Sequence, residues 1–178
     1  MKPDSHNILH HWREAVPNDR MAHLIRDTER AFRRALQLRL AAHGVPFGHW
    51  AFLRILWEAD GLTQKELSQR AGVMEPTTFT AMKAMEAQGY ITRSQIPTNK
   101  KNVYVHLTDA GRALKEKLVP LAEETNKISV EGLAAKEVVA ARKVLLAMLV
   151  NLAKDESTAS DLPVARTNRK PMAKITAN

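Results

Sequence analysis

Cysteine is absent from this sequence of 178 residues. Without cysteine the chain can form neither a disulfide nor a thiolate-ligated metal site, and its composition fits a reducing compartment. No apolar run approaches the roughly 18–20 residues that a membrane-spanning helix needs. The first residues also lack the basic-then-apolar pattern of a signal peptide. We therefore expect a cytoplasmic protein that has no membrane partner.

The residue patterns that carry catalysis are missing as well. The sequence has no glycine-rich phosphate loop, no nucleophile elbow and no cluster of acids near a histidine. Three histidines near the N-terminus, His6, His10 and His11, are the group that most suggests a metal site. The nearest acids are Asp4 and Glu14, which makes a weak set of ligands. We expect no enzyme activity, no cofactor and no bound metal.

Basic residues are in excess, and the formal net charge is +8. A basic balance favours an anionic partner, of which nucleic acid is the first candidate. The excess is spread along the chain, because residues 61–111 contain only six basic and four acidic side chains. Net charge alone therefore does not locate a nucleic-acid surface.

Hydrophobic periodicity predicts a mainly helical chain of one domain with a small β-hairpin. Apolar residues spaced by three and four indicate long helices over 20–42, 47–59, 109–129 and 135–154, and local signals indicate shorter ones over 64–70 and 75–88. The third long helix is expected to break or bend near Pro120. Residues 1–19 and 155–178 are polar and are expected to be flexible or disordered, so the folded domain is predicted over 20–154.

The two short helices carry clear end signals. Thr63 and Glu66 are spaced as a capping box, in which a hydroxyl and a carboxylate each bond a free N–H at a helix start. Gly72 supplies a tight turn between the helices. Pro76 falls in the first turn of the second helix, where its missing N–H costs nothing. These signals predict a helix-turn-helix.

A hairpin with a basic turn follows the helix pair. Val103, Val105 and Leu107 alternate with other residues, which is the period of a half-buried strand, and residues 91–96 are also strand-like. Two adjacent lysines occupy the turn. Solvated turns often have this composition, so the role of the hairpin depends on its neighbours.

Together these elements predict a winged helix-turn-helix whose reading head covers about 61–111. A recognition helix fits the major groove, where its first residues meet base edges. A basic wing suits the narrow minor groove, where the negative potential is enhanced. Phe79 either packs inward or touches a thymine methyl. The residues expected to contact DNA are Thr63, Gln64, Pro76, Thr77, Thr80, Lys83, Asn99, Lys100 and Lys101.

The segment GLTQKELSQRAGVMEPTTFTAMKAMEAQGYITR, followed by VHLTDAG, resembles the MarR family of bacterial transcriptional regulators. The resemblance extends over about 20–154, with the motifs in order and at matching spacings. It implies a homodimer built by the N- and C-terminal helices. It also implies a double-stranded, pseudo-palindromic DNA operator and release by a small aromatic effector.

Two positions depart from the family pattern. Wings of the family usually carry Asp-x-Arg, where this sequence has Asn99 and Lys101. Lysine supplies charge without the planar fork of arginine, so minor-groove contact is expected to be less shape-selective. Thr80 stands where the family often has an arginine, and that DNA contact is either lost or taken over by Lys83.

Family effectors often bind between the dimerisation helices and the DNA-binding lobe. Aromatic side chains with one titratable group suit an aryl ligand there, although the tryptophans could simply be core. An arginine stripe on the first helix suits the carboxylate of an aromatic acid or the phosphates of its coenzyme A thioester. The alternative, which we favour, is that the stripe is solvated or paired with Asp27 and Glu29. The candidate effector residues are Arg26, Arg30, Phe32, Arg33, Phe47, His49, Trp50 and Leu53.

The sequence therefore predicts a sequence-specific transcriptional regulator, most simply a repressor that an aromatic acid or its thioester releases from DNA. Two alternatives remain open. One is a nucleoid-type DNA binder without an effector, and the other is a winged-helix module that binds protein. A footprint separates the first alternative from a regulator, and the second predicts no salt-dependent binding to DNA.

Overall fold

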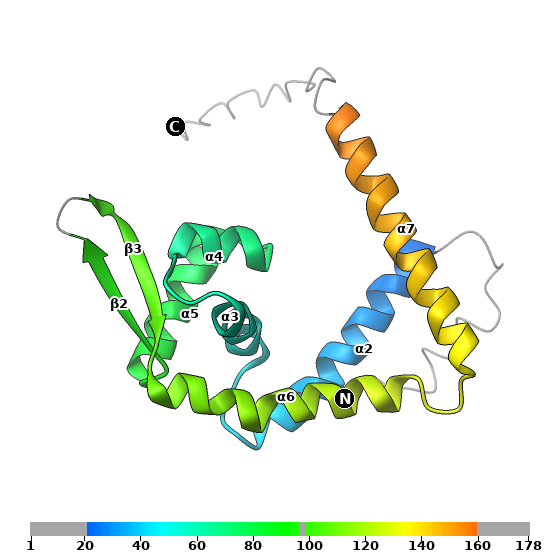
Figure 1. The fold of residues 1–178 in the computed structure, drawn as a ribbon, viewed down its shortest axis with the longest axis horizontal. Helices are drawn as coiled ribbons and strands as arrows, with labels where there is room; N and C mark the ends of the chain where they lie inside the picture. The colour runs from blue at the N-terminus through cyan, green and yellow to red at the C-terminus, as the bar shows by residue number, and fades with distance from the viewer. Residues whose placement is uncertain (1–20, 97–98, 160–178) are drawn as a thin grey trace, which may run out of the picture. The chain divides into compact units, whose positions relative to one another are not determined.

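The computed structural model describes residues 21–96 and 99–159 (Figure 1). The chain divides after Glu131 into two compact units, which we describe separately. The first unit contains α2 (Met21–Ala41), α3 (Phe47–Glu58), β1 (Leu62–Thr63), α4 (Gln64–Ala71), α5 (Glu75–Ala87), β2 (Ile91–Ile96), β3 (Asn99–Leu107) and α6 (Asp109–Ser129). The second unit contains α7 (Ala135–Ala159). This order confirms the predicted winged helix-turn-helix.

Two helix predictions need correction. The predicted break near Pro120 does not occur, because α6 is one helix of 21 residues through that position. Pro120 lies on the exposed side of α6, where water can reach the backbone groups that the proline leaves unpaired. The last helix runs on to Ala159 instead of ending at Lys154, since residues 155–159 contain neither proline nor glycine. The predictions for residues 1–19 and 160–178 lie outside the described residues.

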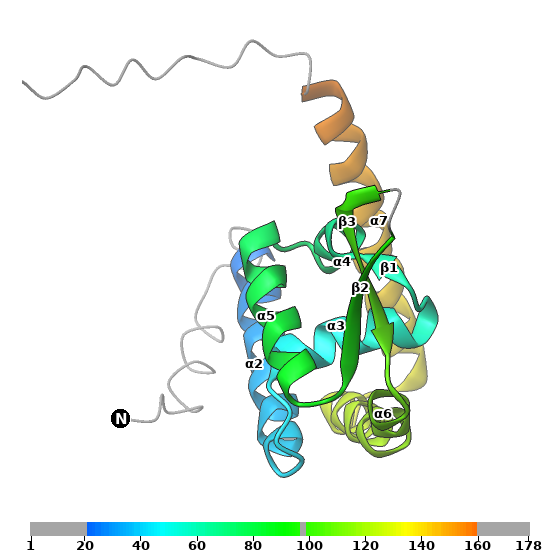
Figure 2. The same ribbon diagram turned by 90° about the vertical axis from the view of Figure 1, so that its left-hand side faces the viewer.

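The sheet has three antiparallel strands in the order β1-β3-β2 (Figure 2). Leu62 pairs with Val105, and Ile91 pairs with Leu107. Sequence periodicity did not indicate β1, because two residues are too few to show an alternation. β1 pairs with Tyr104 and Val105, near the base of the hairpin, and so holds that base to the helix-turn-helix. The part of β2 and β3 nearer the tip extends past β1 (Figure 2).

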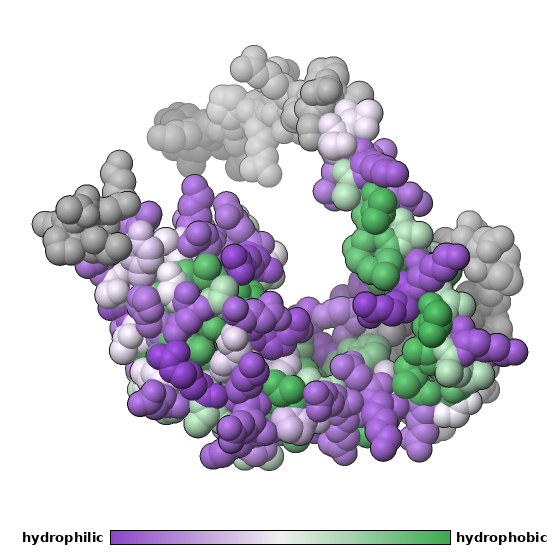
Figure 3. All heavy atoms as spheres, in the orientation of Figure 1, coloured by the Kyte–Doolittle hydropathy of each residue, from purple (hydrophilic) through white to green (hydrophobic). Residues whose placement is uncertain are grey.

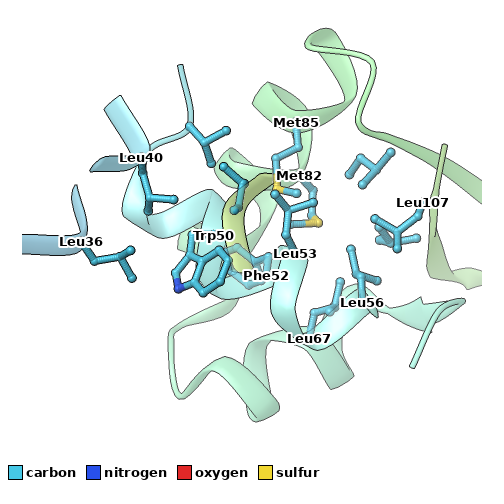
Figure 4. Packing of buried hydrophobic residues seen from close by; sticks show 14 residues of the cluster. Leu36, Leu40, Trp50, Phe52, Leu53, Leu56, Leu67, Met82, Met85 and Leu107 are labelled. Atoms are coloured by element: carbon cyan, nitrogen blue, oxygen red, sulfur yellow. The ribbon is translucent and has the colours of Figure 1, made fainter. Parts of the chain in front are cut away.

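The core of the first unit joins the reading head to the first long helices. Leu53, Leu67 and Met82 from three different helices are fully buried, and Val105 of β3 closes the same cluster (Figure 4). On α5 the buried side chains are Thr78, Met82 and Met85, as the helical period predicts. The opposite face of α5 is therefore left to solvent.

Local bonds explain why the helix pair forms. Thr63 and Glu66 make the predicted capping box at the start of α4, and Gly72 takes a left-handed backbone with φ 64° at its end. The buried hydroxyls of Ser68 and Thr78 are hydrogen-bonded over 2.8 Å, which ties α4 to α5. The turn angle between the two helices is thus fixed by a cap, a glycine and one buried hydrogen bond.

The second unit leaves a long apolar stripe on α7 uncovered in the single chain (Figure 3). Leu145, Leu146 and Leu149 are 46%, 49% and 65% exposed. Leu149 follows Leu146 by three positions and Leu145 by four, so the three side chains lie along one side of the helix. Across the described residues, helices long and apolar enough to span a membrane are absent.

Candidate functional site

The exposed face of α5 is the candidate surface for reading DNA. Pro76, Thr80 and Lys83 are exposed and follow one another at helical spacings of four and three, and Thr77 is exposed beside them. All four residues were predicted to contact DNA, and the structure places them together. The Thr80 hydroxyl donates to the Pro76 carbonyl over 3.0 Å, so its hydrogen is used inside the helix.

Thr63 and Gln64 at the start of α4 are less available than their sequence positions suggested. The Thr63 hydroxyl accepts from the Glu66 N–H and donates to the Glu66 carboxylate over 2.7 Å. The hydrogen bonds that the Thr63 hydroxyl and the Thr63 N–H donate to the Glu66 carboxylate hold its pKa below the usual value. Gln64 is half-buried, and its Nε2 has no hydrogen-bond partner among the described residues. Thr63 therefore serves mainly as a helix cap.

The wing is a regular antiparallel hairpin up to Gln95 and Val103, with an irregular register between Gln95 and Ile96. The backbone of Asn99, Lys100 and Lys101 belongs to β3, which begins at Asn99. The side chains of these three residues lie outside the described residues. Their predicted contacts with the minor groove thus stay a prediction.

An ion pair at the root of the wing joins α3, β3 and α6. The Asp60 carboxylate accepts hydrogen bonds from the Leu107 N–H, the Gly61 N–H and Arg112 Nη1, over 2.9, 2.9 and 2.7 Å. Desolvation opposes ionisation of Asp60, but these bonds outweigh it and the pKa of the carboxyl is lowered. Sequence analysis identified no role for this pair, because the partners are 52 positions apart.

A second ion pair, between α5 and β2, lies beside Phe79. Arg93 donates to Glu86 Oε2 from Nε over 2.9 Å and from Nη2 over 2.6 Å, and this bond lowers the pKa of Glu86. The guanidinium carbon of Arg93 lies 5.9 Å from the centre of the Phe79 ring. Phe79 is 54% exposed. Of the two predicted alternatives for Phe79, inward packing is therefore excluded.

A cleft between α2, α3 and α6 is the candidate effector site. Its first part has a volume of about 210 Å³ and brings together four of the predicted effector residues, Phe32, Arg33, Phe47 and Trp50. Arg54, Thr125 and Asn126 also line it, and sequence analysis had not named them. A second part of about 400 Å³ shares Trp50, Arg54 and Asn126 with the first. Both parts are open to solvent and adjoin these shared residues.

Four predicted effector residues do not line the cleft, and two of these, Leu53 and His49, are buried. Leu53 is fully buried in the core. His49 is buried with Nδ1 3.1 Å from Gln88 Oε1, and desolvation lowers its pKa despite that bond. Trp50 is only 4% exposed and makes an edge-to-face contact with Trp57, with ring centres 5.7 Å apart. Trp50 is therefore a core residue that also lines the cleft.

The arginine stripe of α2 is paired along the helix. Arg33 bonds Glu29 over 2.9 Å from Nε, and its guanidinium carbon lies 5.1 Å from the centre of the Phe47 ring. Arg26 and Arg30 lie 3.4 and 3.9 Å from Asp27, and neither lines the cleft. The alternative in which these arginines pair with neighbouring acids is confirmed.

The three N-terminal histidines considered as metal ligands, His6, His10 and His11, lie outside the described residues. Within the part of the chain that the structure describes, no three histidine or acidic side chains come together as metal ligands.

Comparison with known proteins agrees with this architecture. Residues 48–103 match the MarR family. The HTH-type transcriptional regulator TtmR of Methylorubrum extorquens is 32% identical over 143 residues, which cover 78% of this chain and 70% of that protein.

Two solved structures share the fold. A MarR family transcriptional regulator from Listeria monocytogenes, complexed with a 26mer DNA, superposes with a TM-score of 0.69 at 21% identity, covering 83% of this chain and 99% of that one. Bordetella bronchiseptica BpsR, whose DNA binding is regulated by 6-hydroxynicotinic acid, superposes with a TM-score of 0.68 at 23% identity, covering 73% and 98%. The chain belongs to the MarR family of winged helix-turn-helix transcriptional regulators, which bind DNA and are not enzymes.

Proposed function

We propose that this regulator is a homodimeric repressor, that it binds a pseudo-palindromic operator in the cytoplasm, and that a small aromatic acid releases it. The observation that carries the proposal is the cleft between α2, α3 and α6, because α3 also packs against α4 and α5 of the reading head. A ligand in this cleft contacts the helix that supports the recognition helix. One element thus links effector binding to DNA binding.

The dimer is supported by apolar surface that the single chain leaves uncovered. Besides the leucine stripe of α7, the start of α2 exposes Met21, Leu24 and Ile25. Between α2 and α6 lies an apolar groove of about 350 Å³, which includes Phe32 and Ile128. Surface of this kind on terminal helices is suited to pack against a second copy of the chain.

Lys101 provides the test of the wing. If its side chain lies against a phosphate, Lys101→Ala should lower the slope of log affinity against log salt by about 0.9 for each protomer's contact. Affinity should fall by a similar factor on all DNA sequences. Thr77→Ala should instead change the preference at particular base pairs, because base contacts carry specificity. Both variants are compared in fluorescence anisotropy titrations at several salt concentrations.

Lys127→Ala on α6 is the matched control, since it removes the same charge from an exposed position outside the reading head. It should leave the salt slope unchanged. If Lys101→Ala behaves like Lys127→Ala, the wing does not enter the groove and its lysines are simply solvated.

The chemistry of the cleft favours a free aromatic acid as effector. Phe32, Phe47 and the edge of Trp50 supply apolar area. Arg54 is exposed at the junction of both parts of the cleft and makes no ion pair with a described residue, so it can receive a carboxylate. Arg26 and Arg30 lie outside the cleft, which weakens the case for the phosphates of a coenzyme A thioester.

Replacing Arg54 tests the effector site. In the unaltered protein an aromatic acid should quench or enhance tryptophan fluorescence and release the operator over one concentration range, with a coupling of about 5–150-fold in operator affinity. Arg54→Met keeps the length of the side chain and removes its charge. The variant should therefore bind the operator normally and need much higher acid concentrations for release.

Arg34→Met is the control, because Arg34 is exposed on α2 and does not line the cleft. Its response to the acid should equal that of the unaltered protein. Coenzyme A thioesters are included in the panel of compounds. If no acid or thioester changes either signal, the effector part of the proposal fails and DNA binding stands without it.

A further inference from the structure

The recognition helix α5 has few groups that can hydrogen-bond base edges. Arginine, asparagine and glutamine, which make bidentate contacts with guanine or adenine, do not occur between Glu75 and Ala87. Thr78 is buried against Ser68, and the hydroxyl hydrogen of Thr80 is used by the Pro76 carbonyl. The donors left on the outward face are Thr77 and Lys83.

Acidic residues do not fill this gap. Glu86 is held in its ion pair with Arg93. Glu75 is exposed in the first turn of α5, where its negative charge is repelled by phosphates. Hydrogen bonding from α5 can therefore specify only a small part of an operator.

Apolar groups are plentiful on the same face. Phe79 is the largest apolar side chain that α5 exposes, and Pro76 and Thr80 are exposed at neighbouring positions on the surface of its first two turns. The N-terminal turns of a recognition helix are those that meet base edges. Apolar side chains in the major groove contact the C5-methyl group of thymine, which no other base carries.

The Phe79 ring already contacts a neighbouring side chain before DNA binds. Arg93 lies over the ring at 5.9 Å, and its guanidinium is held by two hydrogen bonds to Glu86. One side of the ring is thus occupied by a side chain of β2, and the rest of it remains exposed. An aromatic ring that already packs against a neighbour on one side loses less conformational freedom when it contacts a base.

We propose that this regulator reads its operator largely through thymine methyl groups, and that Phe79 is a specificity-determining residue for a thymine in each half-site. The proposal rests on the proposed function, since it assumes a sequence-specific operator. It predicts a direct contact between the Phe79 ring and the methyl group of one thymine in each half-site. The shortage of hydrogen-bond donors on α5 makes these apolar contacts the main source of sequence preference.

Uracil substitution tests the contact, because uracil differs from thymine only by the missing methyl group. An operator is first selected from random DNA with the full-length protein. Each thymine of the half-site is then replaced by uracil in turn, and affinity is measured with the unaltered protein and with Phe79→Ala. Loss of one buried methyl should weaken binding of the unaltered protein about fourfold at the contacted position.

Phe79→Ala should bind the thymine and uracil forms of that position equally well. Leu38→Ala is the control, because Leu38 is 78% exposed on α2, outside the reading head. It should keep the fourfold preference. An operator that tolerates uracil at every position, or a preference that Phe79→Ala retains, would overturn this inference while leaving the proposed function intact. Selection of no operator would overturn both.

Discussion

Gly111→Ala is expected to destabilise the protein by about 3–5 kcal/mol, a large part of the stability of an ordinary domain. A Cβ at this position would lie 2.1 Å from the Tyr90 carbonyl oxygen and 3.0 Å from its carbon. Both are backbone atoms and cannot rotate away. Relief requires that the start of α6 separate from the start of β2.

Hydrogen bonds prevent that separation. The Thr108 N–H donates to the Tyr90 carbonyl over 3.1 Å, and the Thr108 hydroxyl donates to the Gly89 carbonyl over 2.6 Å. The Gly111 carbonyl in turn accepts from Trp57 Nε1 over 3.0 Å. Urea denaturation followed by circular dichroism measures the change in unfolding free energy.

Gly48→Ala is the matched control for Gly111→Ala. Gly48 also lies within a helix, but a Cβ there meets nothing within 4 Å. Alanine favours a helix over glycine by up to about 1 kcal/mol, so this variant should be equally stable or slightly more stable. If Gly111→Ala unfolds at nearly the same urea concentration as Gly48→Ala, the tight joint between β2 and α6 is not present in solution.

Loss of the leucine stripe on α7 is expected to abolish the dimer. Burying a leucine contributes about 1.5–3 kcal/mol. Changing Leu145, Leu146 and Leu149 together to serine should therefore remove most of the free energy that holds a dimer with a modest interface together. Monomers must bind two half-sites independently, and operator affinity should fall at least about 100-fold. Analytical ultracentrifugation and operator titration measure the two effects.

Val144→Ser controls for polar substitution on α7. Val144 is 52% exposed and projects from the side of the helix away from the leucine stripe. Val144→Ser should leave the mass measured by ultracentrifugation and the operator affinity nearly unchanged. A triple-serine variant that remains dimeric at micromolar concentration would show that α7 does not supply the interface.

Sequence analysis succeeded where the information is local. The capping box of Thr63 and Glu66, the turn at Gly72 and the buried side of α5 each depend on residues within a few positions of one another. The periodicity of apolar residues indicates which face of a helix or strand is buried. Together with the end signals, it was enough to identify the winged helix-turn-helix.

Features formed by distant residues could not be predicted in the same way. Asp60 is an example, because nothing in the sequence links it to Arg112. The same holds for Arg93 beside Phe79. Leu53 and Trp50 illustrate a different limit. Helical periodicity places both on the apolar side of α3, but it does not show whether a side chain on that side faces the core or a cleft.

Selection of bound sequences from a random DNA pool, followed by a footprint of the winning sequence, tests the central claim most directly. A dimeric regulator should enrich one motif with two-fold symmetry, and its half-sites should be separated by about one helical turn, roughly 10 base pairs. The footprint should protect both halves at the same protein concentration. A nucleoid-type binder would enrich no motif and protect DNA everywhere, and either that result or a single unsymmetrical half-site would contradict the account.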